Sequence, residues 1–310
     1  MGTLKNELVW SHSRDRLFRS CRRAYWFAYY GSWGGWDLRA PPEQRTAYVQ
    51  KKLTSIPQWI GTRVHGAAEQ AIGALCSSRP PDVEANVAQL RRQLQADIDG
   101  SRSGAWLQRP SKRVGFREHY YGEPADETTW TAATAEVERQ VRGFYTNRLY
   151  QRLVAVPERV LEVEQLRRFW VGDAEVYVAL DLLVDDGRGG VVVVDWKTGE
   201  QHDHHEVAGQ LGVYGLYTTR QLGVPEDSVL TMYVNLRSGT ETRHRVGPPE
   251  ISKAEQEIRE GVDSMRAQLT DPAQNVAELE RFPPLPPGAP ACVRCNFRGV
   301  CGRGNVAAPA

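Results

Sequence analysis

The sequence predicts an α/β fold, and three observations lead to this class. Apolar residues recur at helical spacing through much of residues 51–155. Three β-branched runs separated by glycine-containing turns come next and are expected to be consecutive strands. These runs occupy residues 159–169, 174–185 and 190–196. A helix at about 204–221 and a further strand at 228–236 follow, so helices and strands share one unit.

The 310 residues are expected to form a single domain, because neither an internal repeat nor a convincing linker interrupts them. Hydrophobic residues make up 41% and charged residues 25%, which permits a sizeable core and argues against wholesale disorder. In chain order we expect an N-terminal arm at 1–40, a helical region at 41–155, a central core at 156–240 and a C-terminal helix with a cysteine cluster at 241–310.

The N-terminal half is predicted to be mainly helical. Residues 13–30 are basic and aromatic and predict helix, whereas residues 31–50, rich in Gly, Trp and Pro, predict a loop. Helical spacing is clearest in two later series, and each marks the buried face of a helix. The series are Val83, Val87, Leu90 and Leu94, and then Trp130, Val137, Val141 and Phe144.

The C-terminal half carries three local signals. The run GVVVV at 190–194 is fully apolar, which suits a strand buried on both faces. Ser252 and Glu255 form a capping-box pattern, which predicts the start of a helix with Ile258 and Val262 on its apolar face. The segment FPPLPPGAP at 282–290 excludes regular structure and leads to the last cysteines.

Composition excludes several classes of protein. The net charge of +1 gives no global footprint for nucleic acid, so any such function must rest on local residues. No stretch approaches the roughly 18 apolar residues that a membrane span needs, and the N-terminus lacks the pattern of a secretory signal. We therefore expect a cytoplasmic protein without membrane contact. No P-loop sequence occurs, so we expect no ATP-driven motor in the chain.

The most informative stretch is ALDLLVDDGRGGVVVVDWKTGE at 179–200. Asp181 and Asp195 lie on two adjacent predicted strands, which can bring both carboxylates to one place. Lys197 follows Asp195 by two residues, so alternation puts it on the same face of the strand. Two carboxylates would hold a hard cation such as Mg²⁺ or Mn²⁺, and an ammonium group could orient water and offset charge on a phosphorane-like transition state. Taken alone, the motif is better explained as an exposed Asp–Lys ion pair beside a turn, because Asp-x-Lys is common at strand ends.

Other residues point toward the same place. Glu162 and Glu164 alternate on one predicted strand face, so either could add a carboxylate. His65 lies on a predicted helix within WIGTRVHGAAEQAI at 59–72, and Gln210 and Tyr214 stand one helical turn apart. Taken singly, each of these residues has an ordinary structural explanation.

Together these pieces resemble the PD-(D/E)XK nuclease superfamily, in particular its RecB-like branch. The matching segments are IGTRVH for a Gly-x-x-x-His helix, Glu164 for an early acid, LDLLV for an Asp strand, VVVDWKTG for the Asp-x-Lys core and QLGVY for a Gln-x-x-x-Tyr helix. They cover residues 59–217 in the family's order, although Ala179 stands where members often have glycine. The resemblance implies a restriction-endonuclease-like core, a central mixed sheet flanked by helices.

The resemblance also implies roles for individual residues. Expected ligands of Mg²⁺ or Mn²⁺ are His65, Asp181, Asp195 and the Trp196 carbonyl. The expected catalytic set is Asp181, Asp195, Lys197, Glu164, Gln210 and Tyr214, in which Lys197 serves the attacking water and Gln210 and Tyr214 shape the site and meet DNA.

The implied activity is metal-dependent hydrolysis of DNA, by an exonuclease that acts on single-stranded or frayed ends. The implied setting is DNA repair, recombination or defence against foreign DNA, with a separate helicase or a recombination or defence complex as partner. The alternative is a non-catalytic DNA-binding or scaffold subunit of a larger nucleoprotein complex. Intact Asp181, Asp195 and Lys197 argue against that alternative, because a decayed site would usually have lost one of them.

Five cysteines form a second constellation. Cys292, Cys295 and Cys301 give a Cys-x2-Cys-x5-Cys tail, Cys21 lies near the other end, and Cys76 is expected to be a buried free thiol. An odd, clustered set without a signal sequence indicates thiols or metal ligands, either zinc or iron–sulfur.

An iron–sulfur subgroup of these nucleases, which includes the CRISPR-associated RecB-like nucleases and the AddB nuclease subunit, has a similar arrangement. Its members carry one cysteine before the nuclease core, in a segment that SCRRAYWFAYYG resembles, although Arg22 stands in place of proline. The resemblance therefore favours a [4Fe–4S] cluster on Cys21, Cys292, Cys295 and Cys301, with zinc as the alternative. Such a cluster would staple the two chain ends together.

The segment SKRVGFREHYY at 111–121 interleaves basic with aromatic residues. Lys112, Arg113 and Arg117 could contact phosphates, and Phe116 could stack on bases, which would suit single-stranded DNA. An ordinary exposed loop is the alternative explanation.

Overall fold

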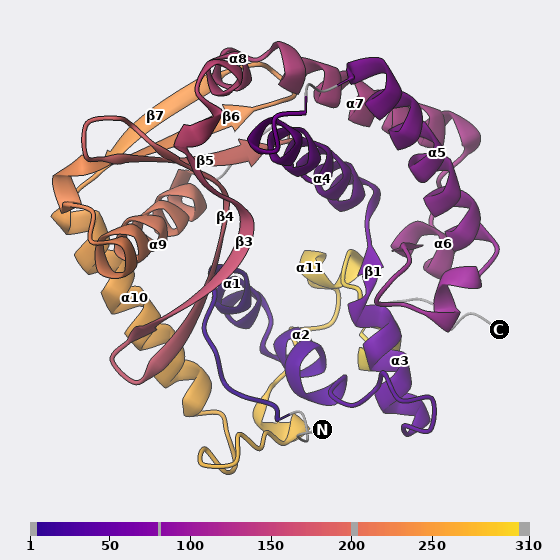
Figure 1. The fold of residues 1–310 in the computed structure, drawn as a ribbon. Coiled ribbons are helices and arrows are strands. Elements are labelled where there is room, and N and C mark those ends of the chain that lie inside the picture. The colour runs from indigo at the N-terminus through magenta and orange to yellow at the C-terminus, as the bar shows by residue number, and fades with distance from the viewer. Residues whose placement is uncertain (1–4, 80–81, 200–203, 304–310) are drawn as a thin grey trace.

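The computed structural model describes residues 5–79, 82–199 and 204–303, and it confirms the α/β class. A five-stranded mixed sheet has helices on both faces (Figure 1). The strands lie side by side in the order β3-β4-β5-β6-β7; β5 and β6 are parallel and the other neighbours are antiparallel. Their bounds are β3 Val160–Val171, β4 Ala174–Asp185, β5 Val191–Lys197, β6 Val229–Asn235 and β7 Glu241–Val246.

Strand β5 is the centre of the sheet, between β4 and β6. Val193 and Val194 point to opposite faces and both are fully buried, as the apolar run predicts. Because β5 and β6 are parallel, a crossover must join them, and α9 (His204–Leu222) provides it. The carboxyl end of β5, which carries the Asp-x-Lys motif, therefore lies beside this helix.

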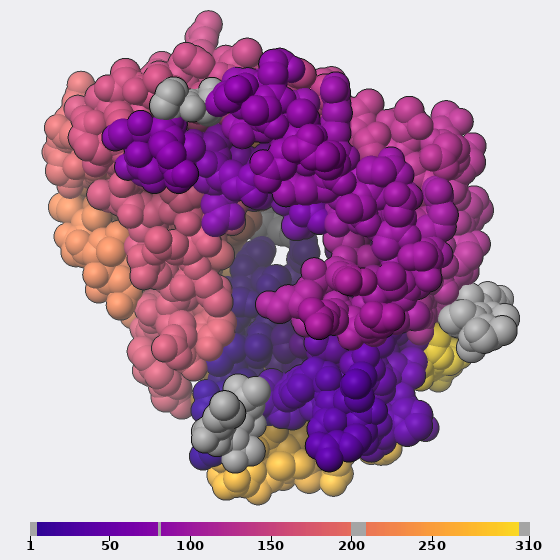
Figure 2. Space-filling model, turned by 45° about the vertical axis from the view of Figure 1, so that its right-hand side comes forward, coloured from indigo at the N-terminus to yellow at the C-terminus, as the bar shows by residue number. Residues whose placement is uncertain are grey.

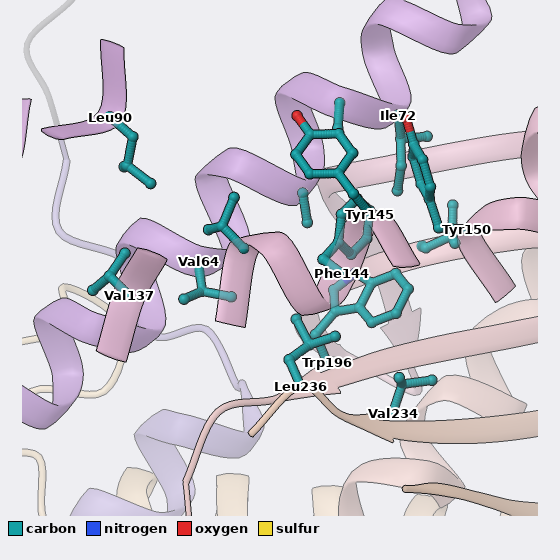
Figure 3. Packing of buried hydrophobic residues seen from close by; sticks show 14 of the residues in the cluster. Val64, Ile72, Leu90, Val137, Phe144, Tyr145, Tyr150, Trp196, Val234 and Leu236 are labelled. Atoms are coloured by element: carbon teal, nitrogen blue, oxygen red, sulfur yellow. The ribbon is translucent and has the colours of Figure 1, made fainter. Parts of the chain in front are cut away.

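On one face, four helices share a continuous hydrophobic core with the sheet, the second of them through its packing on the third. These helices are α4 (Ile56–Cys76), α5 (Val83–Arg102), α7 (Glu127–Thr146) and α8 (Arg148–Ala155). Val64, Val137 and Phe144 from them belong to the same buried cluster as Trp196 in β5, and Phe144 lies beside it (Figure 3). The ring of Trp196 meets that of Phe144 edge to face at 5.3 Å, a favourable aromatic geometry that fixes this residue of β5.

The opposite face is covered by α9 and α10 (Pro248–Arg266). Gly212 lets the two helices approach closely, because a Cβ there would lie 2.7 Å from the Glu250 carbonyl oxygen. Helix α10 begins earlier than the sequence predicted: the Glu250 carboxylate accepts a hydrogen bond from Gly247 N at 3.1 Å, and prolines occupy the first helical positions. The expected start at Ser252 is therefore wrong, since that residue lies inside the helix.

The N-terminal arm is helical, as expected for 13–30, and consists of α1 (His12–Ser20), α2 (Arg22–Trp26) and a π-helical turn at Phe27–Gly31. The loop expected at 31–50 is partly wrong, because α3 spans Pro42–Lys51. A proline in the first helical position loses no hydrogen bond, so here it starts a helix.

Short elements complete the fold. They are β1 Leu53–Thr54, β2 Gly115–Phe116, α6 Arg117–Tyr121, α11 Pro290–Val293, α12 Arg298–Cys301 and 3₁₀ turns at Ala105–Gln108, Pro157–Arg159, Glu226–Ser228 and Leu279–Arg281. Strands β1 and β2 pair in parallel as a separate small sheet. Among the helices in the described ranges, none combines the length and the apolar composition needed to cross a bilayer.

Strand β7 was not predicted, because its sequence ETRHRV is charged and mostly exposed. It is an edge strand that pairs only with β6, and its last residue, Val246, is buried against α9 and α10. Charged residues are usual on such edges, since they discourage pairing with another chain. The sheet therefore extends beyond the expected core at 156–240.

The elements surround an opening. In Figure 2 the background is visible through the middle of the molecule. Rose-coloured strand residues border the opening on one side, magenta helical residues on the other and the indigo N-terminal arm below. In Figure 1 the same parts form a ring, in which α1 and α3 lie below α4. The N-terminal arm is therefore part of the wall of the opening.

Candidate active site

Three elements bring an imidazole and two carboxylates together. His65 comes from α4, Glu164 from β3 and Asp181 from β4, and one ligand atom of each lies within 4.8 Å of the others. His65 Nδ1 is 3.0 Å from Glu164 Oε1 and 3.5 Å from Asp181 Oδ2. His65 and Glu164 line a pocket of about 440 Å³ on the surface of α4.

Gly61, one turn before His65, allows α4 to lie close to the end of β5. A Cβ at this position would lie 3.2 Å from Thr198 Oγ1, which is tighter than ordinary packing. The Gly-x-x-x-His spacing therefore has a physical basis, because the glycine admits the close approach and the histidine, on the same helix face, reaches the carboxylates.

The backbone of Trp196 completes the group from β5. Its N–H donates to Asp181 Oδ2 at 2.7 Å, and its carbonyl oxygen accepts from His65 Nε2 at 3.1 Å. Because the indole is held in the core on the helical side (Figure 3), these two backbone atoms have a fixed position. The Trp196 carbonyl thus lies with the three side chains.

Asp195 and Lys197 share a face of β5, as alternation predicts, and meet α9. Lys197 Nζ lies 2.5 Å from Asp195 Oδ2 and donates to Gln210 Oε1 at 3.4 Å. The Tyr214 hydroxyl donates to Asp195 Oδ1 at 3.1 Å and accepts from Gln210 Nε2 at 2.5 Å. Gln210 and Tyr214 therefore position the ammonium and the carboxylate from one helix face.

Charge is concentrated at this place. Burial, together with the nearby charge of Asp181, raises the pKa of Asp195 to about 6, although Lys197 opposes the change. Burial by itself would lower the pKa of His65, but hydrogen bonds to Asp181 and Glu164 and their charges outweigh it and raise that pKa to about 10. The positive charge of the protonated His65 imidazole thus offsets the negative charges of Asp181 and Glu164.

The donor set fits a hard divalent cation. An imidazole nitrogen, carboxylate oxygens and a main-chain carbonyl are ligands that Mn²⁺ accepts, and Mg²⁺ favours the oxygens. Oδ2 of Asp195 is buried and accepts no well-directed hydrogen bond, since the Lys197 ammonium approaches outside the favoured directions. A cation would satisfy this oxygen and relieve the repulsion between Asp181 and Asp195.

The structure separates Glu164 from Glu162, which the sequence places on one face. Glu164 lies opposite Asp181 in the strand register and has a left-handed backbone with φ of +47°. Glu162 points instead toward α9, where it accepts from the Tyr217 hydroxyl at 3.1 Å and pairs with Arg167. The prediction that Glu162 and Glu164 share a face is therefore wrong, because side chains alternate only along extended residues. The left-handed backbone of Glu164 costs about 1–3 kcal/mol and marks a constrained site.

The two glutamates should respond differently to the same change. If the site binds a divalent cation and cleaves DNA, as the sequence resemblance implies, Glu164→Gln should lower metal affinity and cleavage about 10–100-fold, because it removes a charge beside His65 and Asp181. Glu162→Gln should keep cleavage but lower the unfolding temperature, since Arg167 and Tyr217 lose a buried ionised partner. Mn²⁺ titration, cleavage rates and thermal melts of both variants test this, and equal losses of activity would contradict it.

The expected DNA-binding residues are only partly at the surface. Phe116 is fully buried between Trp59 and Trp130, so the expected stacking on bases is wrong. Arg117 is tied to Glu123 at 3.1 Å. Tyr214 is 2% exposed, so it supports Asp195 and offers no ring to DNA. Core packing decided these positions, and the sequence pattern of 111–121 did not reveal it.

Lys112 and Arg113 from the same segment are exposed. Arg113 donates to the Ala105 carbonyl oxygen at 3.1 Å, and part of its surface remains open to solvent. Both side chains could therefore reach phosphates.

One face of the β3–β4 hairpin was missed by sequence reasoning. Leu166 and Trp170 are 64% and 58% exposed, and Arg168 between them is also exposed. In the strand register these residues share a face with Glu164 and Asp181, while the intervening positions face α9 and α10. An apolar and basic stripe thus extends from the carboxylate group; the alternation 166–168–170 was its available signal.

Four cysteines line one small pocket, and all are free thiols. Cys21 caps α2, and its sulfur accepts from Ala24 N at 3.4 Å. Cys295 accepts from Phe297 N at 3.4 Å, and burial, with the nearby Cys21, Cys301 and Cys292, raises its pKa to about 11. The N-terminal arm and the C-terminal cysteine segment therefore meet at this pocket.

Cys76 lies outside this pocket, and its expected burial is wrong. It is the last residue of α4 and is exposed, because it falls on the outer side of the helix. Its thiol is therefore separated from the four cysteines in both position and environment.

Arg298 also lines the cysteine pocket and was not anticipated. It is 4% exposed, lies 2.5 Å from Glu123 and stacks 3.8 Å over the Tyr121 ring. These contacts join the cysteine tail to α6. No sequence pattern predicts the role of Arg298, because its partners Glu123 and Tyr121 are distant in the chain.

Comparison with known proteins gives one strong match. A model of the PD-(D/E)XK nuclease superfamily matches residues 9–302. The curated proteins contain no match to the sequence. One solved structure, "Crystal structure of SSO0001", is 14% identical, with a TM-score of 0.31, over 68% of this chain and 80% of that chain. A likeness at that level carries no argument.

Proposed function

The chain belongs to the PD-(D/E)XK nuclease superfamily, whose activity is hydrolysis of phosphodiester bonds, and on this premise we propose that it is a Mg²⁺- or Mn²⁺-dependent deoxyribonuclease. The observation that carries the proposal is the meeting of His65, Glu164 and Asp181 beside the buried Asp195 and its half-buried partner Lys197. A decayed, purely structural member would have no reason to keep a buried carboxylate next to further carboxylates, since burying such a charge is costly.

The residues divide into holding and positioning roles. His65, Asp181, Asp195 and the Trp196 carbonyl would hold the cation, and Glu164 would add charge beside them. The bound cation would supply Lewis acidity toward the phosphodiester and its attacking water.

Lys197 would orient that water or donate to a phosphate oxygen as negative charge develops there. Gln210 contacts the Lys197 ammonium, and Tyr214 contacts Asp195, so α9 restricts the rotamers of the reacting pair. The catalytic geometry would therefore depend on how β5 and α9 pack together.

We further propose a single-stranded or frayed DNA substrate that is shortened from an end. Two features support it: the opening in Figure 2 and the exposed stripe with Arg168 and Trp170, which shares a face with the candidate cation ligands. Exposed aromatics stack on unpaired bases and arginines contact phosphates, whereas a duplex hides its bases. Repair, recombination or defence against foreign DNA, with a separate helicase to part the strands, would suit this activity.

Cleavage should be faster on linear single strands and frayed ends than on blunt duplex, and slowest on closed circular duplex. The reason is that only an unpaired end can enter an opening. ATP should have no effect, and binding should weaken as salt rises because phosphate contacts release counterions. A time course on labelled substrates with Mg²⁺ or Mn²⁺ tests this. Equal rates on single strands and closed circular duplex would reject the end-dependent substrate and leave the nuclease assignment in place.

We also propose that Cys21, Cys292, Cys295 and Cys301 bind a [4Fe–4S] cluster with a structural role. Four half-buried thiols that line one pocket, with backbone N–H groups directed at two of the sulfurs, fit a cluster of this kind. Zinc would use the same four ligands, and metal analysis distinguishes the two.

A further inference from the structure

Two cations, Arg14 and Lys51, lie over the ring of Tyr29, and the charge of a third, Lys52, acts on Lys51. The guanidinium of Arg14 lies 4.1 Å from the centre of the Tyr29 ring, and Lys51 Nζ lies 5.1 Å from the same centre. Lys52 is the next residue along, and its Nζ lies 5.6 Å from the Tyr48 ring. The cations come from α1 and from the end of α3, so the fold brings them together from two elements.

No acidic group balances this cluster. In the described ranges, no carboxylate oxygen lies within 4.0 Å of the charged nitrogens of Arg14, Lys51 or Lys52. Partly buried arginines elsewhere do have acids, as Arg63 has Asp97. Burial, together with the charges of Lys52 and Arg14, lowers the pKa of Lys51 to about 8. Like charges held together without a counter-ion cost free energy, which a bound anion would recover.

The chain connects this cluster to the candidate active site. Helix α3 passes through β1 directly into α4, which carries His65. From Ile56 to His65 the helix rises by roughly 14 Å at about 1.5 Å per residue. The cations and His65 are therefore joined by one continuous piece of chain, with β1 and the first turns of α4 between them. Arg14 lies in α1 of the N-terminal arm and Lys51 and Lys52 at the end of α3, and both helices belong to the ring of elements in Figure 1.

We propose that Arg14, Lys51 and Lys52 bind a backbone phosphate of the substrate strand, at a point other than the bond that is cleaved. The inference rests on the proposed nuclease function and adds a second point of attachment to it. Tyr29 holds two of the cations over its ring, so they are oriented before the strand arrives. A strand held at two points enters the active site in a fixed register.

The test compares Lys51→Gln/Lys52→Gln with a control of equal charge loss, Arg92→Gln/Lys253→Gln, whose side chains are exposed on α5 and α10. Fluorescence anisotropy with an internally labelled single strand in EDTA gives affinity without cleavage. We expect the cluster variant to bind about 10–100-fold more weakly and its log–log salt slope to fall by about 1.4, which is two contacts at about 0.7 each. The control should bind like the unmodified protein.

Two further arms separate the alternatives. Lys51→Arg/Lys52→Arg should restore binding, because it restores the charge, which excludes a mere loss of folding. A small activated phosphodiester that reaches only the cation ligands should be cleaved by the cluster variant at the unmodified rate. Equal binding by the cluster variant and the control would overturn the proposal, as would a loss seen only with 5′-phosphorylated strands, which would indicate recognition of a terminal phosphate.

The binding arm does not depend on catalysis. If the unmodified protein cleaved no DNA but bound it through these cations, the nuclease proposal would fail and the phosphate site would stand. If the unmodified protein cleaved DNA and the cluster variant bound DNA normally, the nuclease proposal would stand and the phosphate site would fail.

Discussion

Asp195→Asn should reduce divalent-metal-dependent cleavage of DNA by on the order of 10³-fold or more. Asparagine keeps the shape of the side chain and its hydrogen bond to Tyr214, but it removes the charge that would hold the cation. The unfolding temperature should not fall, because Asp195 is a buried carboxylate repelled by Asp181, and its neutralisation relieves that repulsion. Cleavage rates and calorimetric melts of the same preparation measure both effects.

Lys197→Met separates catalysis from cation binding. Methionine fills the space of the side chain but cannot orient water or donate to phosphate, so cleavage should fall by a similar factor while Mn²⁺ still binds in calorimetric titration. Asp195→Asn, in contrast, should lose both DNA cleavage and Mn²⁺ binding. Asp263→Asn, an exposed change on α10, serves as the control and should alter neither. Cleavage retained by Asp195→Asn combined with Lys197→Met would remove these residues from the reaction.

Cys21→Ser should abolish the cluster and lower the unfolding temperature by on the order of 10 °C. The cysteine lies near one end of the chain and its three partners lie near the other, so ligation closes a very long loop and restricts the unfolded chain. Anaerobic preparations of the unmodified protein should be brown, with iron and acid-labile sulfide at about four each per chain. Absorbance, metal analysis and thermal melts measure these properties.

Cys76→Ser is the matched control for the cluster. This thiol is exposed at the end of α4, outside the cysteine pocket, so its removal should leave iron content and melting unchanged. Stoichiometric zinc without iron in anaerobic preparations would return the site to the zinc alternative. Unchanged iron content in Cys21→Ser would remove this residue from the ligand set.

The sequence predicted what depends on regular periodicity. Asp195 and Lys197 share a face because alternation along β5 is undisturbed, and Gln210 meets Tyr214 because α9 is regular. The partnership of distant segments, such as α4 with β3 and β4, came only from the resemblance to a family. Nothing in the spacing between His65 and Asp181 requires them to meet, since a chain contact depends on the tertiary fold.

The features that the sequence did not predict are those for which a local rule allows two outcomes. Pro42 could end a helix or begin one, and here it begins α3. Glu164 could continue the strand or turn left-handed, and the turn sends it away from Glu162. Phe116 could stack on bases or fill the core, and the rings of Trp59 and Trp130 enclose it. Each outcome is decided by packing against residues far along the chain, which a single sequence does not reveal.

The opening bordered by the sheet, the helices and the N-terminal arm has a topological consequence (Figure 2). A strand threaded through a closed rim can leave only along its own axis, so it stays linked to the protein even when individual contacts break. Under the proposed function, each cut shortens a strand that is already captured, and sliding supplies the next bond. Such an enzyme would be processive without a motor, because the closed rim, rather than tight binding, would keep the strand on the protein between cuts.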